Sequence, residues 1–303
     1  MKTTARRFGV WIGIMALSMA MVPVCAAQLS GPKRATSKQA LHRSRVVVQE
    51  RSFASAALQR TVKYNVVLPV GYESSQKRYP VLYLLHGWNG DYTNWVRLTN
   101  LVKYAEQFDM IIVTPDAGNS WYVNSATAPR NRVQDYVAND LVDDVDRNWR
   151  TIAAPHRRAI AGLSMGGYGS VLLALKYPGT FAMAGSISGA FDGPTRVEHD
   201  MPQLLESVIE AYGPADSTTR AENDVYRLSA TAEPNRVPYF YIDCGSQDPL
   251  VESNRKLIRA LAAQGLRYEY HEYAGAHTWE YWDRELPELL KAAWKAVSAT
   301  KTR

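Results

Sequence analysis

The sequence predicts an α/β fold, in which a mostly parallel central sheet is covered by helices on both faces. Short apolar runs, typical of strands buried on both faces, alternate along the chain with stretches that have helical apolar spacing. The composition suits a large core, because 46% of the 303 residues are hydrophobic and 21% are charged. A glycine-flanked serine at a strand-to-helix turn is the third observation.

The N-terminal 27 residues have the pattern of a secretory signal. Basic residues come first, an uncharged apolar segment follows over residues 8–24, and small residues end the pattern. The basic residues are Lys2, Arg6 and Arg7, and the small ones are Ala26 and Ala27. We expect a secreted or periplasmic protein without stable membrane insertion after cleavage. A retained anchor is the alternative, because about 17 apolar residues is the shortest length that spans a bilayer.

Charge and cysteine content exclude several classes of function. The net charge of +6 is concentrated near the N-terminus, where residues 28–44 form a polar, basic and flexible leader, and no basic face recurs. Nucleic-acid binding is therefore not expected. After cleavage only Cys244 remains, so no internal disulfide is possible, and no cluster of cysteine and histidine suggests a metal.

The strands and helices of a single domain over residues 45–303 follow from local patterns. Residues 80–85 form a continuous apolar run typical of a central strand, and apolar residues in 135–149 have the spacing of an amphipathic helix. The expected strands are 46–48, 61–68, 80–85, 110–113, 157–161, 181–187, 237–242 and 267–273, and the expected helices are 92–107, 135–149, 167–175, 251–264 and 278–297.

One stretch, residues 191–236, interrupts the alternation. It is polar and punctuated by prolines, with helical apolar spacing over 201–211. It follows the carboxyl end of a strand, the edge at which ligands bind in open α/β sheets. We therefore expect a cap-like insertion that partly covers the site, with a solvated surface excursion as the alternative.

Ser164 is the expected nucleophile. It lies at the centre of the sequence Gly-Leu-Ser-Met-Gly, between an apolar strand and a helix. Small residues on both sides allow the strained turn that lifts a serine oxygen out of the sheet. An ordinary glycine-rich turn is the alternative interpretation.

His277 and Asp248 are the expected base and acid. His277 lies in a small-residue loop between the last strand and the last helix, and Asp248 follows a strand, which gives the chain order serine, acid, histidine. The acid accepts the second N–H of the histidine and stabilises the imidazolium. The alternatives are a structural role for His277, a helix-capping role for Asp248, and Asp243 as the acid.

The oxyanion hole is expected from two backbone N–H groups. Met165 directly follows the serine, and Trp88 lies in a glycine-rich loop that follows the strand at 80–85. His86, in the same loop, is expected to position the loop rather than to react. The aromatic side chains of Trp121, Tyr122 and Trp279 fall on or near the site loops and are candidates for substrate binding, with core packing as the alternative.

These motifs together resemble the esterase D family of α/β-hydrolases. The residues that carry the resemblance are Leu84–Gly87, Gly162–Gly167, Cys244–Asp248 and Gly275–Trp279. The family includes S-formylglutathione hydrolases, tributyrin esterases, feruloyl and acetylxylan esterases, and mycolyltransferases. The resemblance implies the α/β-hydrolase fold, with Ser164, Asp248 and His277 in the roles given above and no metal or organic cofactor.

The sequence thus predicts a serine carboxylesterase that hydrolyses short-chain or sugar and phenolic esters, free or linked to a polysaccharide, through an acyl-enzyme. Three alternatives remain: acyl transfer of the mycolyltransferase type, a thioesterase similar to S-formylglutathione hydrolase, and a non-catalytic binding protein on the same fold. A signal peptide argues against the thioesterase, because that activity is cytosolic.

Overall fold

The computed structural model describes residues 46–197 and 201–299. The chain divides into a unit over Met1–His42 and a unit over Arg43–Arg303, and the described residues all belong to the second. The expected signal peptide and leader therefore lie outside the described residues. None of the described helices is long and apolar enough to span a membrane.

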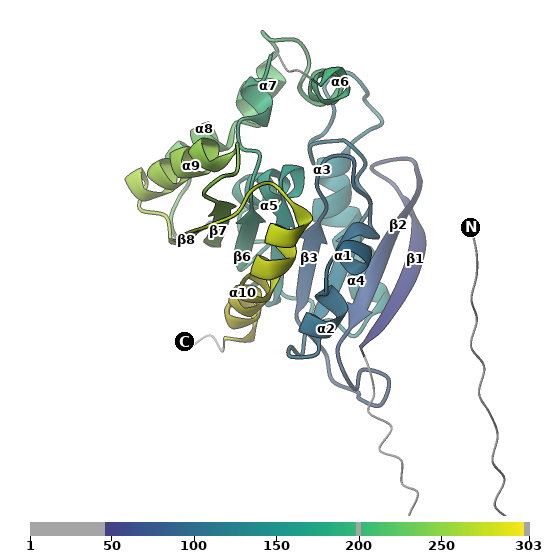
Figure 1. Ribbon diagram of the computed structural model, residues 1–303. Coiled ribbons are helices and arrows are strands. Elements are labelled where there is room, and N and C mark those ends of the chain that lie inside the picture. The colour runs from purple at the N-terminus through teal and green to yellow at the C-terminus, as the bar shows by residue number, and fades with distance from the viewer. Residues whose placement is uncertain (1–45, 198–200, 300–303) are drawn as a thin grey trace, which may run out of the picture. The chain divides into compact units, whose positions relative to one another are not determined.

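An eight-stranded sheet forms the centre of the domain (Figure 1). Its strand order is β1-β2-β4-β3-β5-β6-β7-β8, and β2 alone runs antiparallel to its neighbours. The mostly parallel sheet expected from the sequence is thus confirmed. The strands are β1 (Val47–Ser55), β2 (Arg60–Leu68), β3 (Val81–Leu85), β4 (Ile111–Pro115), β5 (Arg158–Leu163), β6 (Met183–Ile187), β7 (Tyr239–Gly245) and β8 (Tyr268–Tyr273).

Helices cover both faces of the sheet, as expected. Helices α4, α5, α8 and α9 pack on one face, whereas α1, α2 and α10 pack on the other. The helices are α1 (Asn94–Leu98), α2 (Leu101–Ala105), α3 (Val133–Asp135), a π-helical turn (Tyr136–Asp140), α4 (Leu141–Asn148), α5 (Met165–Lys176), α6 (Pro202–Tyr212), α7 (Thr218–Glu222), α8 (Val225–Thr231), α9 (Val251–Ala263) and α10 (Trp279–Ser298), with 3-10 turns at Pro155–Arg157 and Gly193–Thr195.

The core consists of two apolar layers that the sheet separates. Successive residues of a strand point to opposite faces. In β3, for example, Tyr83 and Leu85 belong to the layer of α4 and α5, and Leu82 and Leu84 belong to the layer of α10. All four are fully buried, which explains why the sequence of this strand is apolar without alternation.

Two elements differ from the expectation. The single helix expected over 92–107 is broken into α1 and α2, because Thr99 is extended and its hydroxyl donates to the carbonyl of Trp95 at 2.5 Å. The first strand is also longer than the expected 46–48. β1 is an edge strand with many exposed side chains, so it lacks the apolar run by which strands are found.

The described part of 191–236 contains α6, α7 and α8, and the expected helix at 201–211 is observed as α6. Figure 1 shows α6 and α7 beyond the end of the sheet. Helix α8 packs on α5 and α9, as the buried side chain of Val225 indicates. This stretch is therefore not one continuous excursion, because its last helix belongs to the packed layer.

Candidate active site

The chain turns sharply at Ser164 between β5 and α5. Ser164 has φ 52° and ψ −117°, a backbone conformation that residues other than glycine rarely adopt. A Cβ atom added to Gly162 would lie 2.5 Å from the carbonyl carbon of Gly166, and one added to Gly166 would lie 2.6 Å from the carbonyl oxygen of Leu85. Both glycines are therefore required for the close approach of β5, α5 and β3.

Three backbone hydrogen bonds hold this strained turn in place. The N–H of Ser164 donates to the carbonyl of Ile187 at 3.0 Å, and its own carbonyl accepts from the N–H groups of Tyr168 and Ala190, each at 3.0 Å. The serine is thus tied to the end of β6 as well as to its own helix. Its side chain remains partly exposed.

Ser164, His277 and Asp248 form a row of hydrogen bonds. Nε2 of His277 lies 3.0 Å from Oγ of Ser164, and Nδ1 of His277 lies 2.9 Å from Oδ2 of Asp248. Because an ionised carboxylate can only accept, Nδ1 carries the proton and Nε2 accepts from the serine hydroxyl. The His277 side chain is 28% exposed and that of Asp248 is 0% exposed, so the row runs from the interior to the surface.

Asp248 is held in its ionised form. Burial by itself raises the pKa of a carboxyl group, but the hydrogen bond from His277 and that from the Leu250 N–H, at 2.8 Å, outweigh it. The pKa of Asp248 therefore lies below its usual value.

The rival carboxylate, Asp243, has another partner. Its Oδ1 accepts from the hydroxyl of Tyr281 at 2.5 Å, within the core. Burial raises the pKa of Asp243 to about 7. The structure therefore places Asp248, and not Asp243, beside His277.

The buried ring of His86 joins two loops behind the site. Its Nε2 accepts from the N–H of Ala117 at 3.0 Å, so Nδ1 carries the proton and donates to the carbonyl of Gly87 at 2.8 Å. Burial lowers the pKa of His86, which is consistent with this neutral form. Within the part of the chain that the structure describes, the hydrogen bonds of the His86 ring are to Gly87 and Ala117 and not to Ser164, in agreement with the expected positioning role.

This arrangement fixes the peptide unit that contains the N–H of Trp88. The carbonyl of Gly87 and the N–H of Trp88 belong to one planar peptide and point in opposite directions. That carbonyl accepts from His86 and from the N–H of Gly90, at 3.0 Å. The N–H of Trp88 is thereby directed away from His86. Met165 is the first residue of α5, where N–H groups have no partner within the helix.

Asn119 provides a second support for the same loop. Its Oδ1 accepts from the N–H of Asn89 at 2.7 Å, and its Nδ2 donates to Oδ1 of Asn89 at 3.0 Å. Asn89 has φ 57°, a left-handed conformation that asparagine tolerates. The loop after β3 is therefore held both from the core and from the surface.

Two of the three candidate substrate-binding residues are corrected by the structure. Trp121 and Tyr122 are 2% and 0% exposed, so they are core residues without a free surface for substrate. The hydroxyl of Tyr122 instead donates to the carbonyl of His86 at 2.9 Å. Trp279 is partly exposed and packs edge-on against Trp95 and Trp282, which keeps it a candidate.

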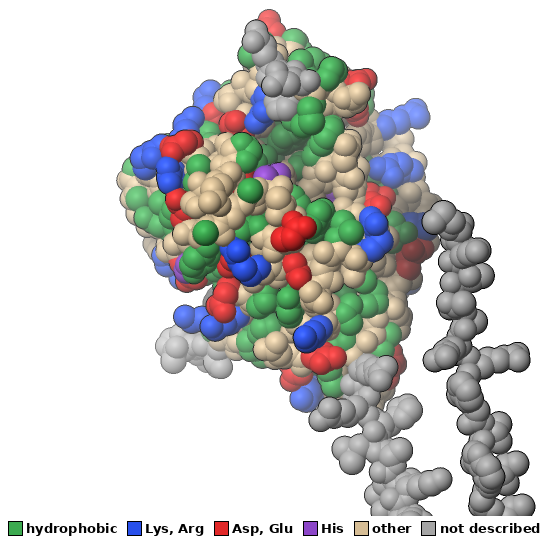
Figure 2. Space-filling view, in the orientation of Figure 1, with side chains coloured by type: hydrophobic (Ala, Val, Ile, Leu, Met, Phe, Trp, Pro, Cys, Tyr) green, Lys and Arg blue, Asp and Glu red, His purple; other side chains and the backbone are tan. Residues whose placement is uncertain are grey.

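Sequence patterns did not reveal the role of Ser207 on α6. Its Oγ accepts from the indole N–H of Trp88 at 3.1 Å and from that of Trp121 at 3.0 Å, and it donates to the carbonyl of Leu204 at 2.7 Å. Ser207 therefore connects α6 to the loop after β3. In the view of Figure 2, histidine atoms are visible in a hollow of the molecular surface, and hydrophobic side chains lie above this hollow.

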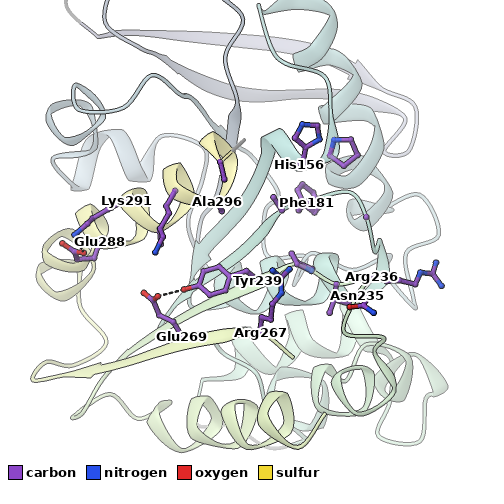
Figure 3. A pocket seen from close by; sticks show the side chains of 18 residues that line it. His156, Phe181, Asn235, Arg236, Tyr239, Arg267, Glu269, Glu288, Lys291 and Ala296 are labelled. Atoms are coloured by element: carbon purple, nitrogen blue, oxygen red, sulfur yellow. Dashed lines mark hydrogen bonds and ion pairs between the residues drawn. The ribbon is translucent and has the colours of Figure 1, made fainter. Parts of the chain in front are cut away.

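A separate cavity of about 940 Å³ opens at the opposite edge of the sheet, where β6, β7 and β8 begin (Figure 3). Glu269, on its wall, accepts from the hydroxyl of Tyr239 at 2.5 Å, and Lys291 pairs with Glu288 at 3.2 Å. These charged groups already have partners within the protein, and none of them belongs to the serine site.

The described residues include no group of three or more histidine, cysteine, aspartate or glutamate side chains that could hold a metal ion. Cys244 is a free, buried thiol. Burial raises its pKa, so it remains protonated and unreactive.

The chain is similar to known esterases. A family model named Esterase, with the description "Putative esterase", matches residues 55–293. An acetyl esterase of Caldicellulosiruptor saccharolyticus is 25% identical over 265 residues, which cover 81% of this chain and 97% of that protein. An esterase of Mycobacterium tuberculosis is 30% identical over 74% of this chain, but the match spans only 54% of that longer protein.

A solved structure is also similar. The fluorophosphonate-binding serine hydrolase F of Staphylococcus aureus, in a substrate-bound form, has a TM-score of 0.75 and 26% sequence identity. The similarity covers 82% of this chain and 98% of that one.

Proposed function

The chain belongs to the Esterase family and is a serine ester hydrolase, and on that premise we propose a secreted or periplasmic carboxylesterase for short-chain, sugar or phenolic esters. The similarity to an acetyl esterase supports short acyl groups. The basic, then apolar, then small-residue pattern over residues 1–27 supports export.

In the first half of the reaction, Ser164 Oγ attacks the ester carbonyl and its proton passes to Nε2 of His277. The N–H groups of Trp88 and Met165 stabilise the oxyanion that forms. When the tetrahedral intermediate collapses, the bond to the alcohol oxygen breaks and His277 returns the proton to that oxygen. The acyl group remains on Ser164.

In the second half, His277 takes a proton from water, and the resulting hydroxide attacks the acyl-enzyme. The bond to Ser164 breaks, the serine regains its proton from His277, and the carboxylic acid leaves. Asp248 accepts the Nδ1 proton of His277 throughout and stabilises the imidazolium without becoming protonated itself.

The observation that carries this proposal is the hydrogen-bonded row of Ser164, His277 and Asp248 at a strained strand-to-helix turn. Residues from three separate loops meet there. His277 has the tautomer that general-base catalysis needs, because its Nε2 is free to accept the serine proton. The same sheet edge receives the loop after β3 with Trp88, because β3, β5, β7 and β8 run parallel.

Replacement of Ser164 by alanine tests the proposal. Ser164→Ala should abolish labelling by a fluorophosphonate probe and hydrolysis of an acetyl ester, whereas Ser74→Ala, at an exposed turn, should leave both unchanged. Labelling that persisted in a folded Ser164→Ala protein would overturn the assignment.

The substrate class can be identified by measuring kcat/KM for a panel of acetyl, butyryl, feruloyl and longer-chain esters and a glutathione thioester. We expect the highest kcat/KM among the short-chain or feruloyl oxygen esters. A preference for the thioester would contradict the proposal. Addition of a sugar acceptor separates transfer from hydrolysis, because transfer yields an acylated sugar instead of the free acid.

We also propose that the insertion over 191–236 partly covers the cleft. The support is Ser207, by which α6 is tied to the indole of Trp88, next to the proposed oxyanion hole. The part of a bound substrate that extends from the proposed oxyanion hole toward the indole of Trp88 would contact the α6 region.

A further inference from the structure

His277 is packed against a tryptophan of the last helix. The ring of Trp282, in α10, lies edge-on to the imidazole of His277, with 4.9 Å between the ring centroids and 90° between the ring planes. Aromatic pairs prefer such edge-to-face contacts. Trp282 is buried, whereas the His277 side chain is 28% exposed, so the indole contacts the base from the protein interior.

The hydrogen bonds of His277 leave one motion of its ring weakly restrained. Nε2 lies 3.0 Å from Ser164 Oγ, and Nδ1 lies 2.9 Å from Asp248 Oδ2. Hydrogen bonds at the two ring nitrogens are directed within the plane of the imidazole. They set the distances along the row but oppose a tilt of the ring out of this plane only weakly. A second ring packed perpendicular to the imidazole opposes that tilt directly, because the core around it is close-packed.

Trp282 is itself fixed in the core. Its indole N–H donates to the hydroxyl of Ser188 at 3.2 Å, and the backbone N–H of Ser188 donates to the carbonyl of Asp243, on β7, at 2.7 Å. Trp282 and Ser188 are both buried, so water does not compete for the hydrogen bond between them. Ser188 directly follows β6, the neighbour of the strand that ends at the nucleophile. The indole is therefore anchored to the same end of the sheet.

Two further tryptophans extend this contact. Trp279 packs edge-on against Trp282 with 5.0 Å between the ring centroids, and Trp95 packs edge-on against Trp279 at 6.1 Å. Trp95 is fully buried, and its indole N–H donates to the carbonyl of Leu85, the last residue of β3, at 3.0 Å. Three indoles in contact thus connect the end of β3 to His277.

We infer that Trp282 is a positioning residue, which holds the imidazole plane of His277 in line with its two hydrogen-bond partners. This inference rests on the proposed function. His277 must accept the proton of Ser164 and then deliver it to the leaving alcohol, so its ring has to keep one orientation through both transfers. Orientation of the reacting groups contributes directly to the rate. Trp282 acts through His277 and needs no contact with the substrate.

Trp282→Leu removes the indole and tests the inference. We expect kcat for an acetyl ester to fall about tenfold with little change in KM, because proton transfer is impaired and substrate binding is not. The low-field proton NMR signal of the His277 Nδ1–H should broaden, since a mobile ring exposes this proton to exchange with water. Rates are normalised to the sites that a fluorophosphonate probe labels at completion, so misfolded protein does not count.

Trp282→Phe is the conservative variant. It keeps an aromatic ring next to His277 but lacks the N–H that Ser188 accepts. We therefore expect a partial rescue, with kcat lower than in the wild type by only about threefold. This variant also decides the question if Trp282→Leu fails to fold.

Trp294→Leu is the matched control, because it removes another tryptophan from the same helix. Trp294 lies near the other end of α10 and packs against Phe108, with 6.5 Å between the ring centroids. Its loss should lower the stability to urea, but kcat per labelled site and the NMR signal should keep their wild-type values.

A wild-type kcat per labelled site and an unchanged NMR signal in Trp282→Leu, or in Trp282→Phe if the leucine variant does not fold, would overturn the inference. An equal fall of kcat in Trp294→Leu would also overturn it, because the effect would then be a general loss of core packing. Failure of the proposed function is a separate result, which would show as probe labelling or hydrolysis that survives in Ser164→Ala.

Discussion

His86 and Asp243 are both buried, and burial disfavours the charged form of each. For His86 the neutral form is required by its contacts, because Nε2 must accept from the N–H of Ala117. For Asp243 the burial has no such benefit, because its Oδ2 has no hydrogen-bond partner among the described residues. We therefore expect different outcomes when His86 and Asp243 are substituted.

His86→Ala should impair the oxyanion hole. Without the ring, the carbonyl of Gly87 loses a donor and the N–H of Trp88 loses its fixed direction. We expect kcat for an acetyl ester to fall by about 10²-fold, the lower range for loss of one oxyanion donor. His156→Ala, at the opposite edge of the sheet, is the control and should have full activity. Equal activity of the two variants would show that His86 does not orient the loop.

Asp243→Asn should change how stability depends on pH. The pKa of Asp243 is about 7 in the folded protein and about 4 when unfolded, so the folded state binds the proton more tightly. Its contribution to stability is fully present below pH ~4 and is lost as the pH rises through about 7. The difference between the two pKa values corresponds to an upper limit of about 4 kcal/mol.

Asparagine carries no charge, and its oxygen still accepts from Tyr281. The variant should therefore gain stability relative to the wild type between pH 5 and pH 8. Urea unfolding at both pH values measures the gain. If the two proteins lost stability in parallel over this range, Asp243 would not be the titrating group.

Among the elements, α6 is connected to the loop after β3 by the hydroxyl of Ser207. Ser207→Ala leaves the indole N–H groups of Trp88 and Trp121 without their acceptor, so α6 should shift relative to the loop after β3. We expect a change in the ranking among acetyl, butyryl and feruloyl esters that is larger than any change in labelling by a small fluorophosphonate. Ester ranking is measured as kcat/KM for each ester.

Glu206→Ala, on the exposed side of the same helix, is the control for this prediction. It should preserve the ester ranking of the wild type. If Ser207→Ala preserved it too, α6 would be a surface excursion without contact to substrate, which is the alternative raised by its polar sequence.

Elements with a strong periodicity were predictable, and those decided by tertiary contacts were not. The buried strand β3 is apolar throughout, and β5 is apolar after Arg158, which identifies both strands without other information. The break between α1 and α2, in contrast, depends partly on Asp283 of α10, which accepts from the backbone N–H of Asn100 at 2.7 Å. Such a contact between distant segments leaves no local pattern.

At the scale of the whole molecule, chain order and a parallel sheet were enough to predict which residues meet. Ser164, Asp248 and His277 each follow a strand, and parallel strands end at the same edge. Neighbours of these residues were harder to predict. Trp121 and Tyr122 are placed on a site loop by sequence, but burial gives them supporting roles, and Ser207 became evident only from its hydrogen bonds to the indoles of Trp88 and Trp121.

Ser164 is expected to carry the acyl group during turnover. Rapid acid quenching of the enzyme during reaction with excess p-nitrophenyl acetate, followed by peptide mass spectrometry, locates the acyl group. We predict an acetyl group on Ser164 at up to one per chain, formed in a burst before steady state and absent from Ser164→Ala. Acetylation of another residue in step with turnover, or steady hydrolysis by a folded Ser164→Ala protein, would show that Ser164 is not the nucleophile.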